Sequence, residues 1–202
     1  MSVQPKWVEK IKGWRDKYVR KEFLSVRQEA EDEARKMLKA HLKHFDQESL
    51  KYLLILFTKE LYNNKISISR FRPAFLGANR NGIAGCLDSF NKWSTRLWQA
   101  SESNLGSLLD EFWQRKNPDR TKGAGTSLPT MILYLRDPLS YNVWTPYLAQ
   151  GFECITGSFI GLKEHGATYL RYNEEVKKFR ILYNLQPQEV DFILYKANKE
   201  PA

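Results

Sequence analysis

The sequence has few residues of the kinds that build metal centres, nucleophilic sites and disulfide frameworks. Two cysteines and three histidines occur among its 202 residues. Cys86 and Cys154 lie far apart, and neither has a second cysteine or a close histidine at the spacing of zinc ligands. The histidines are dispersed and accompany no serine, cysteine or carboxylate set. We therefore expect no cofactor, no metal and no disulfide, and a reducing cytoplasm fits this cysteine usage.

Long apolar runs are also absent. The longest, Leu53 to Phe57, is far shorter than the roughly 20 residues that a membrane helix needs. The first twelve residues scatter Trp7, Val8 and Ile11 among lysines and lack the apolar stretch of a secretory signal. We expect a cytoplasmic protein without a membrane partner.

Positive charge and aromatic residues are abundant by comparison. Lysine and arginine number 32 against 23 acidic residues, so the formal net charge is +9. Hydrophobic residues make up 42% and aromatic residues 13% of the chain, which is enough to bury one sizeable core. An excess of cations attracts polyanions, either nucleic acid or an anionic membrane. Composition thus predicts a folded protein with an affinity for polyanions.

Apolar residues recur at helical spacing along most of the chain. Residues 5–45 form either two helices or one long bent helix, and the charged run Gln28 to Glu33 is expected to be a solvated helix face. Further helices are expected at 47–62 with Asp46 as N-cap, and at 87–98, 105–115, 128–135, 146–152, 168–184 and 187–198. Residues 65–71 alternate in polarity and are the one fair strand candidate in the first half.

This pattern predicts an all-α or predominantly α fold, with an N-terminal helical segment and at most a short β element. Residues 1–62 would form the N-terminal segment, packed on a main helical domain of residues 63–202. A single continuous domain spanning 1–202 is the alternative, because the length alone does not require two domains.

A glycine-containing turn, Lys122 to Ser127, precedes the helix expected at 128–135 and is called the glycine turn. Glycines let backbone N–H groups approach a phosphate, and a helix N-terminus favours negative charge. The turn lacks the Gly-Lys-Ser/Thr ending of a nucleotide-binding P-loop. Its Gly-x-Gly pattern resembles a helix-hairpin-helix, which holds DNA through backbone phosphates, whereas the alternative is an ordinary capped loop. The residues that we expect to contact DNA here are Lys122, Gly123, Gly125, Thr126 and Ser127.

A second candidate segment, Arg70 to Gly82, mixes cations, amides and aromatic rings. Arginine pairs with phosphate or guanine, and asparagine reads an adenine edge. The alternative is a loop that is anchored by its apolar residues and whose arginines are solvated. The DNA contacts expected here, together with Lys92 on the following helix, are Arg70, Arg72, Asn79, Arg80 and Asn81.

No catalytic constellation is visible. In the glycosylases that carry a helix-hairpin-helix, a catalytic aspartate follows the glycines by a span that ends here at Asn142. Asparagine has no charge with which to activate a nucleophile or stabilise a cationic sugar. We expect Asn142 and Trp144 to line a pocket for a modified or flipped base instead. An enzyme would have to use a carboxylate such as Asp88 or Asp137.

Three blocks of sequence, Phe75 to Asn81, Leu87 to Trp93 and Gly123 to Trp144, together resemble the N-terminal regions of McrB-like AAA+ GTPases. The likeness covers about residues 65 to 195. It implies a DNA-recognition domain of a prokaryotic restriction or anti-phage defence system that senses modified bases, with an AAA+ motor domain or a nuclease subunit as partner. The chain has no Walker motif, so any GTPase or nuclease activity would belong to another segment or subunit.

The sequence therefore favours a protein that binds double-stranded DNA. A protein–protein interaction module of the same kind of complex and a glycosylase-like enzyme are the alternatives. A contiguous positive groove bordered by Lys122 and Arg80 would favour DNA binding, and scattered cations would favour the interaction module. The DNA assignment requires the two glycine-marked segments to lie together at the surface.

Overall fold

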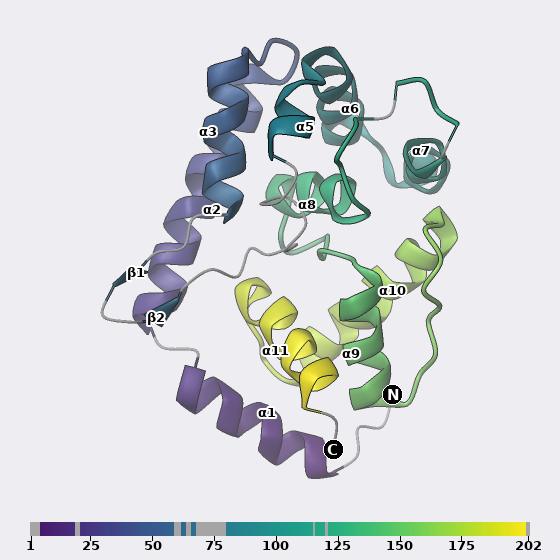
Figure 1. Cartoon of the computed structure of the whole chain (residues 1–202). Helices are drawn as coiled ribbons and strands as arrows, with labels where there is room; N and C mark the ends of the chain where they lie inside the picture. The colour runs from purple at the N-terminus through teal and green to yellow at the C-terminus, as the bar shows by residue number, and fades with distance from the viewer. Residues whose placement is uncertain are drawn as a thin grey trace.

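A computed structural model describes residues 5–18, 21–58, 62–63, 66–67, 80–114, 116–119 and 121–200. The fold is all-α, as expected, and ten helices lie within these residues (Figure 1). They are α1 Pro5–Tyr18, α2 Lys21–His41, α3 Gln47–Thr58, α5 Arg80–Ala84, α6 Leu87–Gln99, α7 Glu102–Trp113, α8 Ser127–Arg136, α9 Pro146–Thr156, α10 Gly166–Leu182 and α11 Pro187–Lys199. The first 45 residues thus contain two helices and not one bent helix.

A short β element accompanies the helices. Strand β1, Tyr62–Asn63, pairs antiparallel with β2, Ile66–Ser67, so that Tyr62 lies opposite Ser67. Strand β2 falls within the stretch whose alternation predicted a strand. Helix α5 was not expected, because the glycines around it indicated irregular chain.

Local chemistry fixes several helix ends. Asp46 accepts a hydrogen bond of 2.7 Å from the backbone N–H of Ser49, which confirms it as the N-cap of α3. The Thr145 hydroxyl accepts one of 3.1 Å from the N–H of Leu148 at the start of α9. That helix ends at Gly157, whose φ of 69° is left-handed and favours glycine.

One hydrophobic core runs through the molecule, from Trp7 to Ala197. Helix α8 lies at its centre, and its residues 127–135 are all buried. In Figure 1, α5, α6 and α7 lie above α8, while α9, α10 and α11 lie below it. Within the described ranges, no helix combines the length and the apolar character needed to cross a bilayer.

Ion pairs join helices α1 and α2 to helix α11. Arg15 of α1 contacts Glu189 of α11 at 2.7 Å. Arg27 of α2 donates two hydrogen bonds to Asp191 of α11, of 2.7 and 3.0 Å. Apolar side chains of α1 and α2 belong to the same core as those of α8 and α11. Core packing and ion pairs therefore both connect residues 1–62 to residues 63–202.

A buried polar cluster lies where α2, α8 and α11 meet. The Glu31 carboxylate is fully buried and accepts hydrogen bonds from Arg27 at 2.8 Å, Tyr134 at 2.9 Å and Gln188 at 2.7 Å. Arg27 is shared with Asp191, so two carboxylates face one guanidinium. The expectation of a solvated face over 28–33 is therefore wrong at Glu31, although Gln28 and Glu29 are exposed.

This cluster predicts a specific pH dependence of stability. Burial raises the pKa of the Glu31 carboxyl above its ordinary value of 4.5 and outweighs the opposing effects of Arg27, Gln188 and Tyr134. A raised folded-state pKa adds stability below the unfolded-state value, and that stability is lost as the pH rises through the folded-state value. The free energy of unfolding of the wild type minus that of Glu31→Gln should therefore fall as the pH rises above 4.5. Urea titrations across this range measure it, and a difference that stays constant or grows contradicts the assignment.

Candidate nucleic-acid interface

The glycine turn between α7 and α8 is held firmly against α6. Trp93 donates its indole N–H to the Asp119 carbonyl at 2.8 Å, and the Ser89 hydroxyl donates to the same oxygen. Ser89 and Thr121 hydroxyls are 2.9 Å apart. Trp93 itself is buried in the core, so its ring is not available to stack on a base.

Lys122 projects from this anchored turn. Its neighbours Thr121 and Ala124 are buried, whereas the Lys122 side chain is exposed. Gly123 has a backbone φ of 80°, a conformation that residues with a side chain rarely adopt, so glycine is needed to make the turn. The turn thus holds the Lys122 backbone in place and leaves its side chain free to meet a ligand.

The second candidate segment ends against this turn. A Cβ placed on Gly82 of α5 would lie 3.5 Å from the Lys122 carbonyl oxygen and 3.8 Å from the Gly123 Cα. The backbones of α5 and the turn are therefore in close contact. Asn81, beside Gly82, is exposed. Asn81 and Gly82, at the end of the second candidate segment, therefore lie on the same surface as the glycine turn.

Other residues expected in this segment cannot be placed on that surface. Arg70, Arg72 and Asn79 lie outside the described residues, and so does the side chain of Arg80, although its backbone begins α5.

Two cations on α6 are already paired. Lys92 forms an ion pair with Asp119, and both side chains are about half exposed. One turn further on, Arg96 donates two hydrogen bonds of 2.6 and 2.5 Å to Glu111 of α7. The bonds from Arg96 hold the pKa of Glu111 below its ordinary value. The sequence alone does not indicate this role of Asp119, because Asn117-Pro118-Asp119 is typical of a break between helices.

The start of α8 is less accessible than the helix-hairpin-helix resemblance implies. Ser127 is 1% exposed and Leu128 is fully buried, while Gly125 and Thr126 are partly exposed. Trp113 donates its indole N–H to the Thr126 carbonyl at 3.3 Å. Ser127 is therefore unable to contact DNA in this conformation, and Lys122 is the most exposed of the residues expected to do so in this turn.

The pocket expected at Asn142 and Trp144 is closed. Asn142 is 2% exposed and donates its side-chain amide to the Asn173 side-chain oxygen at 2.9 Å. Trp144 is fully buried and its ring packs against Trp113 at 5.4 Å between centroids. The Asn142 Oδ1 and Trp144 Nε1 have no hydrogen-bond partner among the described residues. A base could reach them only if the core opened.

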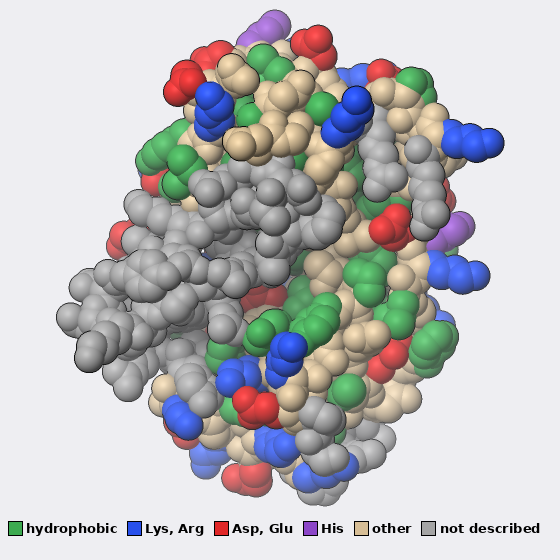
Figure 2. All heavy atoms as spheres, in the orientation of Figure 1, with side chains coloured by type: hydrophobic (Ala, Val, Ile, Leu, Met, Phe, Trp, Pro, Cys, Tyr) green, Lys and Arg blue, Asp and Glu red, His purple; other side chains and the backbone are tan. Residues whose placement is uncertain are grey.

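Charge is mixed over the visible surface. On the face shown in Figure 2, Lys and Arg side chains are scattered and alternate with Asp and Glu. No contiguous positive groove is visible among the described residues of that face, so the view favours the interaction alternative over DNA.

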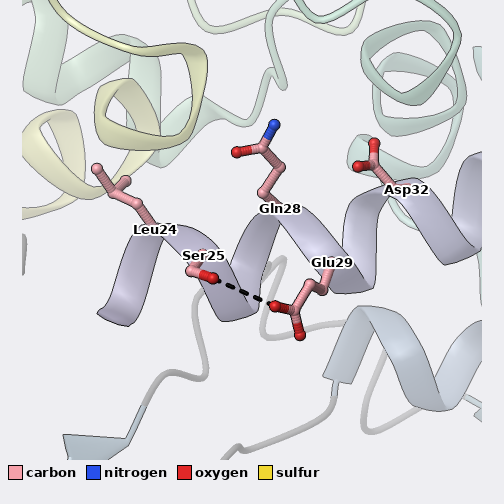
Figure 3. A pocket seen from close by; sticks show the side chains of 5 residues that line it. All are labelled: Leu24, Ser25, Gln28, Glu29 and Asp32. Carbon is pink, nitrogen blue, oxygen red and sulfur yellow. Dashed lines mark hydrogen bonds between the residues drawn. The ribbon is translucent and has the colours of Figure 1, made fainter. Parts of the chain in front are cut away.

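A hollow on α2 is unsuited to a polyanion. It measures about 380 Å³ and is lined by Leu24, Ser25, Gln28, Glu29 and Asp32. In Figure 3 the Glu29 carboxylate accepts a hydrogen bond from Ser25, at 3.2 Å, and Asp32 lies one turn beyond. Asp32 forms an ion pair with Arg35, and the Glu29 carboxylate would repel phosphate.

The described residues contain no cluster of three or more histidine, cysteine or acidic side chains that could hold a metal.

An enzyme would have to use Asp88 or Asp137. The Asp137 carboxylate follows α8 and accepts hydrogen bonds from the backbone N–H groups of Leu139 and Ser140, at 3.0 and 3.2 Å. Burial raises the pKa of Asp137, but the hydrogen bonds from Ser140 and Leu139, together with the charge of Arg136, outweigh burial and the net shift is downward. Asp88 is exposed in the first turn of α6.

Comparison of the chain with protein-family models, with curated proteins and with solved structures finds no match. The likeness to McrB-like N-terminal regions therefore rests on the sequence pattern.

Proposed function

We propose that the chain binds double-stranded DNA through the surface formed by the glycine turn, α5 and the start of α6. The contact between Gly82 and Lys122–Gly123 carries this proposal, because it joins the two segments that the sequence independently marked for DNA. Lys122 supplies an exposed cation, and Asn81 an exposed amide, at that junction. Lys116, in the same connection as Lys122, is also exposed.

Phosphate contacts would supply most of the affinity. Each neutralised phosphate adds about 0.9 to the slope of log affinity against log salt concentration, so binding through several cations weakens steeply as salt rises. The net charge of +9 would attract DNA at long range even where acidic side chains lie between the cations. Mixed surface charge lowers the expected affinity without removing this attraction.

Lys122→Ala should weaken the binding of a labelled duplex several-fold and reduce the salt slope by about 0.9, because one phosphate contact is lost. Fluorescence anisotropy titrations at about 50 and about 200 mM salt measure both quantities. Lys12→Ala is the matched control, since Lys12 is an exposed lysine on α1, at the far end of the molecule from α5 and α6 (Figure 1).

Absence of duplex binding by the wild type at the lower salt concentration would falsify the proposal. Equal losses in Lys122→Ala and Lys12→Ala would place the contact elsewhere on the chain.

The sequence resemblance supports a more specific role, as the recognition domain of a restriction or anti-phage system that works with an AAA+ motor or nuclease subunit. Sensing of a modified base belongs to the same proposal. Because Asn142 and Trp144 are buried, it requires the core around them to open. Equal affinity for modified and plain duplexes would count against this role.

A protein–protein interaction module is the second candidate, and an exposed apolar region supports it. Arg180 donates hydrogen bonds to the carbonyls of Pro138 and Leu139, at 2.8 and 2.6 Å, which holds that loop beside the end of α10. Leu139, Ile181 and Leu182 are exposed there by 65%, 75% and 59%. A partner that binds this region with no DNA affinity in the chain would favour this function.

A further inference from the structure

The Lys92 ammonium already has an anionic partner, Asp119. Its carboxylate forms the ion pair with the Lys92 ammonium at the edge of the glycine turn. Both side chains are 47% exposed, so solvent and a ligand can reach the pair. A cation in such a pair adds little attraction for DNA, because its charge is already balanced by a neighbour.

The Asp119 side chain is not what anchors the turn. The bonds from Ser89 and Trp93 end on its backbone carbonyl oxygen, and its backbone N–H donates to the Asn117 side chain at 2.9 Å. These bonds involve the backbone of Asp119, so a change of carboxylate to amide leaves them in place. The same change removes the ion pair with Lys92.

We propose that Asp119 is an internal competitor for the phosphate backbone, which limits DNA affinity by holding Lys92 in an ion pair. This inference rests on the proposed DNA-binding function and concerns the regulation of the same surface. In the wild type the pair stays closed when DNA binds, so Lys92 makes no phosphate contact, and the negative charge of Asp119 beside the DNA lowers the affinity further.

The other carboxylate near this surface, Glu111, holds its cation more tightly than Asp119 does. Glu111 is held by two hydrogen bonds from Arg96, and Arg96 also stacks on the Trp93 ring at 4.6 Å from its centroid. The Arg96–Glu111 pair is therefore more constrained than the single contact between Lys92 and Asp119. Lys92 is the cation that is more easily released.

Asp119→Asn should bind a labelled duplex several-fold more tightly than the wild type at low salt. Its salt slope should rise by about 0.9, because Lys92 becomes a phosphate contact. The double variant Lys92→Ala with Asp119→Asn should lose this rise in slope. Glu9→Gln is the control, since it adds the same charge change on α1, far from this surface. Urea unfolding of each variant shows that the chain still folds.

The possible outcomes separate this inference from the proposed function. If the wild type binds DNA and Lys122→Ala weakens it while Asp119→Asn has no effect, the DNA surface stands and the competitor role falls. A gain that persists without Lys92, or that Glu9→Gln reproduces, also overturns that role. If neither the wild type nor Asp119→Asn binds, both proposals fail together.

Discussion

Arg27→Ala is expected to lower the free energy of unfolding by about 3–5 kcal/mol, the usual cost of removing one partner from a buried ion pair. Arg27 is 2% exposed and is the guanidinium on which the carboxylates of Glu31 and Asp191 converge. Its removal leaves the Glu31 charge fully buried without its cation. Arg27 also donates to the Gln188 carbonyl at 2.7 Å, so its removal weakens the attachment of α2 to α11.

Urea unfolding followed by circular dichroism measures this loss. Arg171→Ala is the control, an exposed arginine on α10 whose removal should change stability by less than about 0.5 kcal/mol. Arg27→Lys should be intermediate, since an ammonium keeps the charge but lacks the planar fork that spans both carboxylates. Equal stability of Arg27→Ala and Arg171→Ala would show that the cluster does not hold α2 in place.

Gly151→Ala is expected to destabilise the fold by about 1–3 kcal/mol or more, the usual range for overpacking. Helices α9 and α11 approach so closely at this point that a Cβ would lie 2.7 Å from the carbonyl carbon of Leu194. The contact is with backbone, so no side-chain rotation relieves it. Alanine has the better helix propensity, by about 1 kcal/mol, and the clash must exceed that gain.

Gly13→Ala provides the matched control for this substitution. Gly13 also lies inside a helix, α1, but no atom of the described residues lies within 4 Å of the position its Cβ would take. It should therefore gain up to about 1 kcal/mol from propensity alone. Thermal unfolding of the two variants side by side should give shifts of opposite sign, and a gain in both would show that α9 and α11 can separate without cost.

The helices were predictable because their apolar spacing is long and regular. The helical spacing of Phe90, Trp93 and Leu97 was sufficient to predict helix α6, and all three side chains are buried. Helix α5 was missed because five residues are too few to show a period, and Gly82 and Gly85 indicated a loop.

Burial of polar residues was much harder to predict. Glu31 lies within a run of charged residues and looks like part of a solvated face. It is buried because Tyr134 and Gln188, about 100 and 157 residues away along the chain, supply its hydrogen bonds. Asn142 is buried for a similar reason, as Asn173 of α10 satisfies its backbone and side-chain N–H groups. Sequence periodicity reports which residues share a face, but not which partners cover it.

The candidate interface was predictable only in part. Glycines marked both segments, and the contact of Gly82 with the turn bears out their closeness at that point. The pairing of Lys92 with Asp119 was not predictable, because it depends on how the chain after α7 returns to α6. A count of cations overestimates the charge that a ligand meets when carboxylates from other segments lie among them.

The two ends of the described chain meet, and this has a practical consequence for immobilised measurements. Lys10 and Trp14 of α1 each donate a hydrogen bond to Glu200, both at 3.3 Å. Figure 1 shows α1 and the end of α11 at the opposite extremity from α5 and α6. An affinity tag or sensor-chip linker fused at either terminus would therefore attach at the same pole. The turn that carries Lys122 contacts α5 and would therefore lie far from the attachment point.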